Sequence, residues 1–381
     1  ECNDIKWLDS INGTRTTTEA QEKTPAEPPE RPDLQEGDES VEPDGRAFAL
    51  PSHVPGSGML DRLVETARDY ARQAVSENTL KAYAKDWAHF SRWCRMRGTD
   101  PLPSSPQLIG LYIADLAAPQ GKTPVLSVSS IERRLSGLAW GYALRGESLD
   151  RKDRHIATVL AGIRRKHARP PVQKEAILPE DLRDMLATLP HDLRGLRDRA
   201  ILLLGFAGGL RRSEIVALDH GKDDTPESGG WVEVLDGGVL ITLRGKTGWR
   251  EVEIARGSSD QTCPVHALTQ WLHYAKIDFG PIFVAVSRNG LKKTEDRLSD
   301  KHVARLIKQT VRDAGLRPDL PEAERIRLYS GHSLRAGLAS SAEVDERYVQ
   351  KQLGHASAEM TRRYQRRRDR FRVNLTKAAG L

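Results

Sequence analysis

Residues 193–218 read LRGLRDRAILLLGFAGGLRRSEIVAL, a long helical pattern that Gly208 and Gly209 interrupt. Downstream of it, three short segments alternate apolar and polar residues as strands do, with Gly-rich turns between them, at 231–234, 239–243 and 251–254. Helical patterns then resume at 299–314, 333–341, 346–353 and 358–364. This part of the chain is therefore predicted to be a helical domain that contains a small antiparallel sheet.

Upstream, residues 59–170 are predicted to be entirely helical. Five helical patterns follow one another, at 60–74, 76–94, 106–117, 127–144 and 153–167. The paired prolines Pro170 and Pro171 then disfavour helix and predict an extended linker over 169–174, after which a helix restarts over 179–188. The predicted fold class is mainly α with a small antiparallel β-sheet, in two domains.

Charge is unevenly placed along the 381 residues. Residues 1–60 carry 13 acidic and 5 basic side chains, whereas the whole chain carries 53 acidic and 59 basic ones, so the remainder is strongly basic. Residues 1–58 are also rich in Glu, Pro, Thr and Gly, which predicts a disordered acidic tail. The basic remainder suggests a polyanionic partner, most simply nucleic acid.

Several classes of protein are disfavoured by the composition. No run approaches the roughly 18 apolar residues of a membrane helix, and no leader pattern is evident, so no membrane partner is expected. The three cysteines are widely spaced, which fits a reducing cytoplasm better than a disulfide framework. Cys263-Pro264-Val265-His266 loosely resembles a metal motif, but it lacks a second ligand pair, and no metal is predicted.

Two segments carry side chains suited to a phosphodiester. In Gly209-Leu210-Arg211-Arg212-Ser213-Glu214, Arg211 follows the glycine break and can direct two N–H donors at phosphate oxygens. Glu214 lies three residues further on the same helix face and could orient it. In Gly245-Lys246-Thr247-Gly248, Lys246 lies at a tight hairpin between two predicted strands, where it could give a proton to a leaving hydroxyl.

Three further side chains follow near the end of the chain. Gly331-His332-Ser333-Leu334-Arg335 places His332 and Arg335 on one face of a helix start, which favours anions. Leu353-Gly354-His355 precedes Tyr364 by nine residues, and arginines surround that tyrosine, so its phenolate can be stabilised. Each signal alone has an ordinary interpretation, such as a surface ion pair or a solvated turn lysine, but their ordered combination is harder to explain that way.

This order of residues resembles the tyrosine recombinase, or phage integrase, family over about residues 175–381. The matching positions are Arg211, Lys246, His332, Arg335, His355 and Tyr364. Upstream, the segments that resemble the helical core-binding domain of Cre-type members are Val75-Ser76-Glu77-Asn78-Thr79, Trp87, Trp93-Cys94 and Ser130-Ile131 through Arg164-Arg165-Lys166. The resemblance implies a core DNA-binding domain at 59–170 and a catalytic domain at 171–381 that ends in a docking tail. The chain departs from the Cre-type pattern in its acidic tail and in the histidine at 355.

The resemblance also implies a role for each residue. Tyr364 is expected to attack the scissile phosphate, forming a 3′-phosphotyrosyl bond and releasing a 5′-hydroxyl. Arg211 and Arg335 would hold the non-bridging oxygens, and His332 and His355 would donate further hydrogen bonds. Lys246 would protonate the leaving oxygen, and Glu214 would be a support. No metal, ATP or other cofactor is expected, since the arginines and lysine supply the positive charge.

The expected partner is double-stranded DNA with paired recognition sites, bound by a homotetramer encoded by a bacterium, phage or mobile element. The candidate phosphate contacts of the first domain are Lys81, Arg133, Arg134, Arg164, Arg165 and Lys166. Two alternatives remain open at this point: a type IB topoisomerase that relaxes DNA without pairing sites, and a DNA-binding accessory protein with an inactive recombinase fold. The target sequence is also open.

Overall fold

The computed structural model describes residues 58–118, 125–170, 173–245, 248–290 and 293–354, together with Ser357, Glu359 and Arg362. The chain divides into two compact units between Arg169 and Pro170. None of the described helices is both long enough and apolar enough to cross a membrane.

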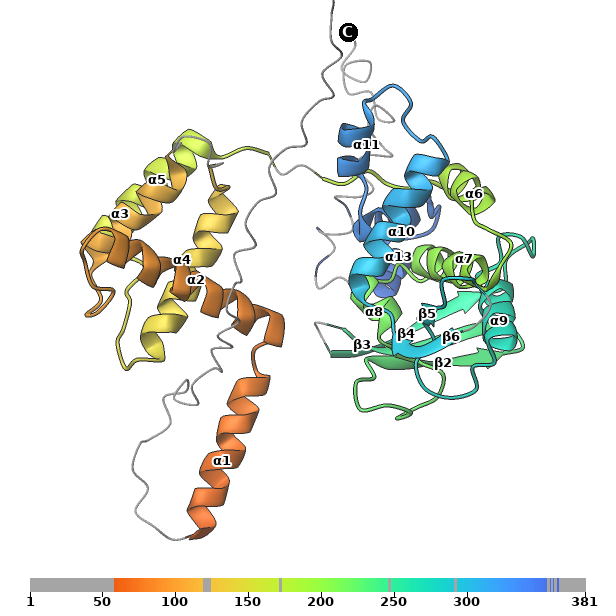
Figure 1. The fold of residues 1–381 in the computed structure, drawn as a ribbon, viewed down its shortest axis with the longest axis horizontal. Coiled ribbons are helices and arrows are strands. Elements are labelled where there is room, and N and C mark those ends of the chain that lie inside the picture. Colours follow the sequence, from red (N-terminus) through yellow and green to blue (C-terminus); the bar gives the residue numbers. More distant parts are fainter. Residues whose placement is uncertain are drawn as a thin grey trace, which may run out of the picture. The chain divides into compact units, whose positions relative to one another are not determined.

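The first unit is all helical in its described residues (Figure 1). Its helices are α1 Gly58–Gln73, α2 Glu77–Met96, α3 Pro106–Ala117, α4 Val128–Ala143 and α5 Arg154–His167. The predicted helices are confirmed to within a few residues. Polar side chains at the preceding turns explain where they begin. Ser76 Oγ accepts the backbone N–H of Thr79 at 3.4 Å, and Ser127 Oγ accepts that of Ser130 at 3.2 Å.

Aromatic side chains from three helices pack against one another in the core of the first unit, alongside aliphatic side chains. Trp87 of α2 meets Tyr142 of α4 edge to face, with ring centroids 5.0 Å apart, and Phe90 meets Tyr112 of α3 in the same way at 5.0 Å. The α2 and α4 helices approach closely because residue 141 is glycine. A Cβ atom on Gly141 would lie 2.2 Å from Cε3 of Trp87. The ring of Trp87 on α2 and the bare backbone of Gly141 on α4 therefore determine how these two helices pack.

The second unit combines eight helices and six strands within its described residues (Figure 1). The helices are α6 Pro179–Ala187, α7 Leu193–Ala207, α8 Arg212–Val216, α9 Pro264–Ala275, α10 Asp300–Asp313, α11 Glu322–Leu328, α12 Gly331–Ser341 and α13 Glu346–Leu353. The strands are β1 Leu218–Asp219, β2 Gly230–Leu235, β3 Gly238–Gly245, β4 Gly248–Ala255, β5 Val284–Val286 and β6 Lys293–Arg297.

The main sheet has the order β1-β2-β3-β4. The three predicted strands are confirmed as β2, β3 and β4, which pair antiparallel. The two-residue β1 adds a parallel edge, and β5 and β6 form a separate antiparallel pair. The pattern did not predict β1, β5 and β6, and it missed α9 and α11. The strands β1 and β5 are only two and three residues long, too short for an alternating pattern to be recognised.

The helix α7 lies at the centre of the second unit. Most of its residues from Gly195 to Gly205 are buried, including Arg197, which is 2% exposed and paired with Asp198 at 2.8 Å. The predicted break after α7 is confirmed at Gly208 and Gly209, beyond which α8 begins at Arg212. The break sets the start of α8, and with it Arg211, against the core.

Candidate active site

Arg211 and Glu214 form a closed pair at the start of α8. Glu214 accepts the backbone N–H of Arg211 at Oε2, at 2.8 Å, and the guanidinium Nη1 of Arg211 at Oε1. The Glu214 side chain is 7% exposed and that of Arg211 is 23% exposed. A half-buried guanidinium is thus oriented by a buried carboxylate, which suits it to donate to an anion in a fixed direction.

Arg335 ties three segments together from the middle of α12. Its Nη1 donates to the carbonyl of Gly209 at 2.5 Å, and its Nη2 donates to the carbonyl of Leu353 at the end of α13. The residue is only 2% exposed. His332, one turn earlier, is exposed, and its backbone N–H donates to the Ser330 hydroxyl that caps the helix. The carbonyl of Gly209 places Arg335 beside the turn that leads to Arg211.

The backbone conformation and the packing around residue 209 both require glycine at this position. Its φ is +54°, in the left-handed region, and a Cβ atom would lie 2.5 Å from Cδ2 of Leu353. The side chain of Leu353 therefore packs against the bare backbone of the turn before Arg211. This contact brings the end of α13 to the start of α8.

Arg250 is a site residue that the sequence reasoning missed. Its Nη2 donates to Oε2 of Glu214 at 3.0 Å, and its Nη1 donates to the carbonyl of Gln352 at 2.6 Å. Burial lowers the pKa of Arg250, and the nearby Glu214 opposes that shift. Strand periodicity could have found it, because Arg250 shares the core-facing side of β4 with the buried Val252 and Ile254.

The Nε of Arg250 is buried and has no hydrogen-bond partner within the part of the chain that the structure describes. Burying an unpaired N–H costs about 1–3 kcal/mol. Buried polar groups without a hydrogen-bond partner are uncommon in native proteins.

Lys246, His355 and Tyr364 lie outside the described residues, but two of their neighbours are described. A Cβ atom on Gly245, the last residue of β3, would lie 3.7 Å from Oε1 of Glu214 and 3.7 Å from Nε of Arg250. A Cβ atom on Gly354, the C-cap of α13, would lie 2.8 Å from Cδ of Arg250. The strand that leads to Lys246 and the helix that leads to His355 therefore both end against Arg250.

Four of the six predicted DNA contacts are engaged inside the first unit. Lys81 pairs with Glu77 at 2.6 Å, Arg133 donates to Asp86 at 2.9 Å, Arg134 donates to Tyr112 at 3.1 Å, and Arg164 donates to Glu132 at 2.7 Å. Asp86 is 3% exposed, and Arg133, together with Arg134 at 3.8 Å, balances this buried carboxylate.

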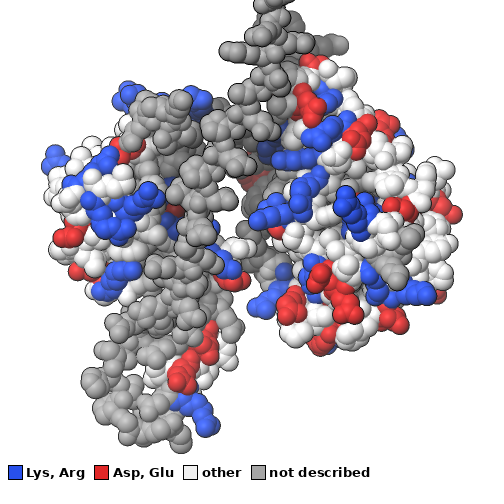
Figure 2. Space-filling view, in the orientation of Figure 1, with Lys and Arg blue, Asp and Glu red and all other residues white. Residues whose placement is uncertain are grey.

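Arg165 and Lys166 are exposed in the last turn of α5, and neither forms an ion pair within the described ranges. Figure 2 shows basic side chains across the visible face of each unit, with acidic ones among them. Of the six predicted DNA contacts, Arg165 and Lys166 are therefore the most available to bind a phosphate.

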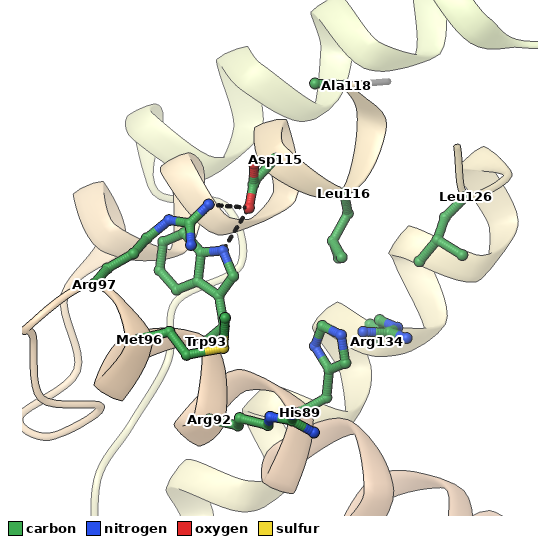
Figure 3. A pocket seen from close by; sticks show the side chains of 10 residues that line it. All are labelled: His89, Arg92, Trp93, Met96, Arg97, Asp115, Leu116, Ala118, Leu126 and Arg134. Atoms are coloured by element: carbon green, nitrogen blue, oxygen red, sulfur yellow. Dashed lines mark hydrogen bonds and ion pairs between the residues drawn. The ribbon is translucent and has the colours of Figure 1, made fainter. Parts of the chain in front are cut away.

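A pocket of about 320 Å³ in the first unit contains none of the predicted catalytic residues (Figure 3). Trp93 and Arg97 form one wall, and both donate to Asp115, at 2.6 and 2.7 Å. His89 and Arg134 line it on another side. The nitrogen Nδ1 of His89 lies 2.8 Å from the Tyr112 hydroxyl. These contacts tie α2 to α3, and we assign the pocket a structural role.

Cys263 and His266 lie at the start of α9. The thiol of Cys263 caps α9, accepting backbone N–H groups from Gly257 at 3.2 Å and from His266 at 3.4 Å. Across the described residues no cluster of three or more His, Cys, Asp or Glu side chains could hold a metal ion. The Cys-Pro-Val-His sequence is a helix start.

Comparison with known proteins decides the family. The model of the phage integrase family matches residues 175–370, just over half of the chain. The chain belongs to the phage integrase family. An integrase/recombinase XerD homolog of Selenomonas ruminantium is 34% identical to it over 331 residues, which cover 82% of this chain and 89% of that protein.

Other relatives bear the same kind of name. The tyrosine recombinase XerD of Bradyrhizobium diazoefficiens is 28% identical over 83% of this chain and 93% of its own length. The tyrosine recombinase XerA of Pyrococcus furiosus is 29% identical over 52% of this chain and 59% of its own length. This family member is thus a site-specific tyrosine recombinase. The relatives carry Xer names, so the Cre-like subgroup stays a prediction.

A solved structure shares the fold. The XerH site-specific recombinase, in a post-cleavage complex with its palindromic difH substrate, superposes with a TM-score of 0.52 at 18% identity. The match covers 86% of this chain and 85% of that one. It supports the mainly helical fold with a small antiparallel sheet that was predicted from the sequence.

Proposed function

We propose that this recombinase cuts and rejoins double-stranded DNA through Tyr364, by way of a covalent 3′-phosphotyrosyl intermediate. The observation that carries the proposal is the network around Arg250 and Glu214. It joins Arg211, the strand that ends before Lys246 and the helix that ends before His355, while Arg335 binds the carbonyls of Gly209 and Leu353. Residues more than a hundred positions apart thus meet at one place.

In the proposed reaction, the phenolic oxygen of Tyr364 attacks the phosphorus, and the bond from phosphorus to the 5′-oxygen breaks. The tyrosine proton passes to His332, and Lys246 gives a proton to the leaving oxygen. The 5′-hydroxyl of a partner strand then attacks the phosphotyrosine and reverses these transfers. Each step exchanges one phosphodiester for another, so no external energy source is required.

Arg211 and Arg335 stabilise the charge that builds on the non-bridging oxygens, with hydrogen bonds from His332 and His355. Arg211 is partly exposed and oriented by Glu214, so it can meet a phosphate directly. Arg335 is 2% exposed, so we expect the site to open around it as DNA binds.

The proposal extends to the assembly. Residues 59–170 form a core DNA-binding domain, and residues 171–381 form the catalytic domain. The segment after Tyr364 docks onto a neighbouring protomer, so that a homotetramer holds two DNA sites in the bacterial cytoplasm. In support of a DNA partner, the XerH structure with the same fold was solved on its difH substrate.

The test begins with selecting the preferred site of the full chain from a random duplex pool. A supercoiled plasmid that carries two copies of that site should then yield recombinants, without ATP and equally well with or without EDTA. Tyr364→Phe should yield none. Relaxation of the plasmid with no recombinants, or recombination by Tyr364→Phe, would count against the proposal.

A further inference from the structure

The side chain of Arg250 forms its hydrogen bonds with two other elements and not with its own strand. It donates through one nitrogen to Glu214 of α8, at 3.0 Å, and through another to the Gln352 carbonyl near the end of α13, at 2.6 Å. Its side chain is 11% exposed. Both partners belong to other elements, one 36 and the other 102 residues away in the sequence. The planar guanidinium therefore joins α8, whose N-cap is Arg211, to the end of α13, which leads to His355.

The shape of the arginine side chain allows it to bridge Glu214 and the Gln352 carbonyl. Two separate Nη nitrogens reach a carboxylate and a carbonyl at once, in a rigid fork. The bare backbone of Gly354 makes room for the fork, because a Cβ atom there would lie 2.9 Å from Nε of Arg250. A lysine has one ammonium at the end of a flexible chain and cannot reproduce the two directions.

The charge balance adds a second effect. Glu214 accepts hydrogen bonds from both Arg211 and Arg250, so the three side chains together carry a formal charge of +1. Without Arg250, the carboxylate would neutralise Arg211 completely. Arg250 therefore preserves the positive potential at Arg211 and also holds the carboxylate that orients it.

We propose that Arg250 is a positioning residue that aligns the Arg211–Glu214 pair with the chain segments leading to Lys246 and His355. This inference rests on the proposed function, because the reaction it supports is the formation of the Tyr364 adduct. Arg250 acts through its neighbours and is not assigned a contact with the phosphate.

The test measures single-turnover adduct formation on a nicked suicide duplex of the selected site, with full-length protein in excess. Arg250→Gln should slow adduct formation by about thirtyfold, the loss typical of a charge-assisted hydrogen bond. Its DNA dissociation constant should stay within about threefold of the parent value. The matched control is Arg256→Gln, just beyond the other end of β4, where the exposed side chain donates only to the Asp236 carbonyl among its described contacts. It should react within about twofold of the parent.

Two further variants separate positioning from general support of the fold. Arg250→Lys keeps the charge and should recover part of the rate, about fivefold below the parent. If Arg250→Gln unfolds at the assay temperature, the adduct rate of Arg250→Lys is compared with those of the parent and Arg256→Gln instead. In the Glu214→Gln background, adding Arg250→Gln should slow the reaction by much less than thirtyfold, because both changes break one network.

The outcomes are distinct. If the parent protein forms no adduct at Tyr364, the proposed function fails. If the parent forms the adduct and Arg250→Gln reacts as fast as Arg256→Gln, only the inference about Arg250 fails. It also fails if the effects of Arg250→Gln and Glu214→Gln multiply independently, or if DNA affinity falls in parallel with the rate.

Discussion

Arg211 and Arg250 donate to the same buried carboxylate, Glu214, while Arg335 donates to two backbone carbonyls. Removing charged side chains from water is unfavourable, and such groups persist where pairing or function retains them. Here, pairing two arginines with one carboxylate leaves positive charge beside a partly exposed guanidinium. At the scale of single residues, this excess charge is what would attract the phosphodiester in the proposed reaction.

Gly354 gives a prediction at the same scale. Its φ is +57°, and a Cβ atom would also lie 2.8 Å from Cδ of Arg250. Gly354→Ala should therefore lower the free energy of unfolding by about 1–2 kcal/mol and slow adduct formation. Gly315→Ala is the control, since φ there is +65° with no atom within 4 Å of the added carbon. Chemical denaturation and adduct kinetics measure both, and equal adduct rates in the two variants would refute the contact with Arg250.

Among the elements, the contact between α2 and α4 gives a prediction about stability. Gly141→Ala places a carbon 2.2 Å from Trp87 Cε3, so the free energy of unfolding should fall by about 1–3 kcal/mol. Gly162→Ala, in the middle of α5, meets no atom within 4 Å and should instead stabilise by about 0.5–1 kcal/mol. Urea titrations of both variants check the opposite signs, and a stable Gly141→Ala protein would contradict the described packing.

His89 predicts how the first unit responds to acid. Burial, with help from Arg134, lowers the pKa of His89 below its ordinary value of about 6.5. The unfolded chain therefore binds the proton more readily. The contribution of His89 to stability is present above pH 6.5 and is lost as the pH falls through the lowered pKa. His89→Gln should flatten the decline in unfolding free energy between pH 7 and pH 5. An unchanged decline would show that other groups cause it.

At the scale of the whole molecule, DNA affinity should depend most on Arg165 and Lys166, the two candidate contacts that form no ion pair within the described residues. Replacing Arg165 and Lys166 with Gln should weaken DNA binding and reduce the slope of log K against log salt by about one for each phosphate that the protein no longer neutralises. Lys81→Gln should change binding less, because Lys81 is already paired with Glu77. Binding titrations at several salt concentrations measure the slopes, and a larger effect from Lys81→Gln would reverse this ranking.

Much of the architecture could be predicted because it is local. Serine caps and apolar spacing located the helices of the first unit, and the Gly208-Gly209 break located the start of α8. The motif Cys263-Pro-Val-His266 was harder to interpret, since a cysteine that caps a helix and one that binds a metal look alike in sequence. Helix α9 was missed there.

The site could be predicted only in part, for the same reason. Arg211 is the N-cap of α8 and Glu214 follows three residues later, so their pairing is a local one, that of a capping box. The bond from Arg335 to the Gly209 carbonyl spans 126 residues, and no local pattern encodes it. Arg250 was missed because its partners come from two other elements, although its inward position on β4 was a usable sign.

The central claim is that Tyr364 becomes covalently joined to DNA. The most direct measurement uses a suicide duplex of the selected site, labelled on the strand that keeps the 3′-phosphate, followed by denaturation and identification of the labelled amino acid. The account predicts a labelled phosphotyrosine at position 364, formed equally in EDTA and absent from Tyr364→Phe. Label on another residue, or an adduct that persists in Tyr364→Phe, would contradict it.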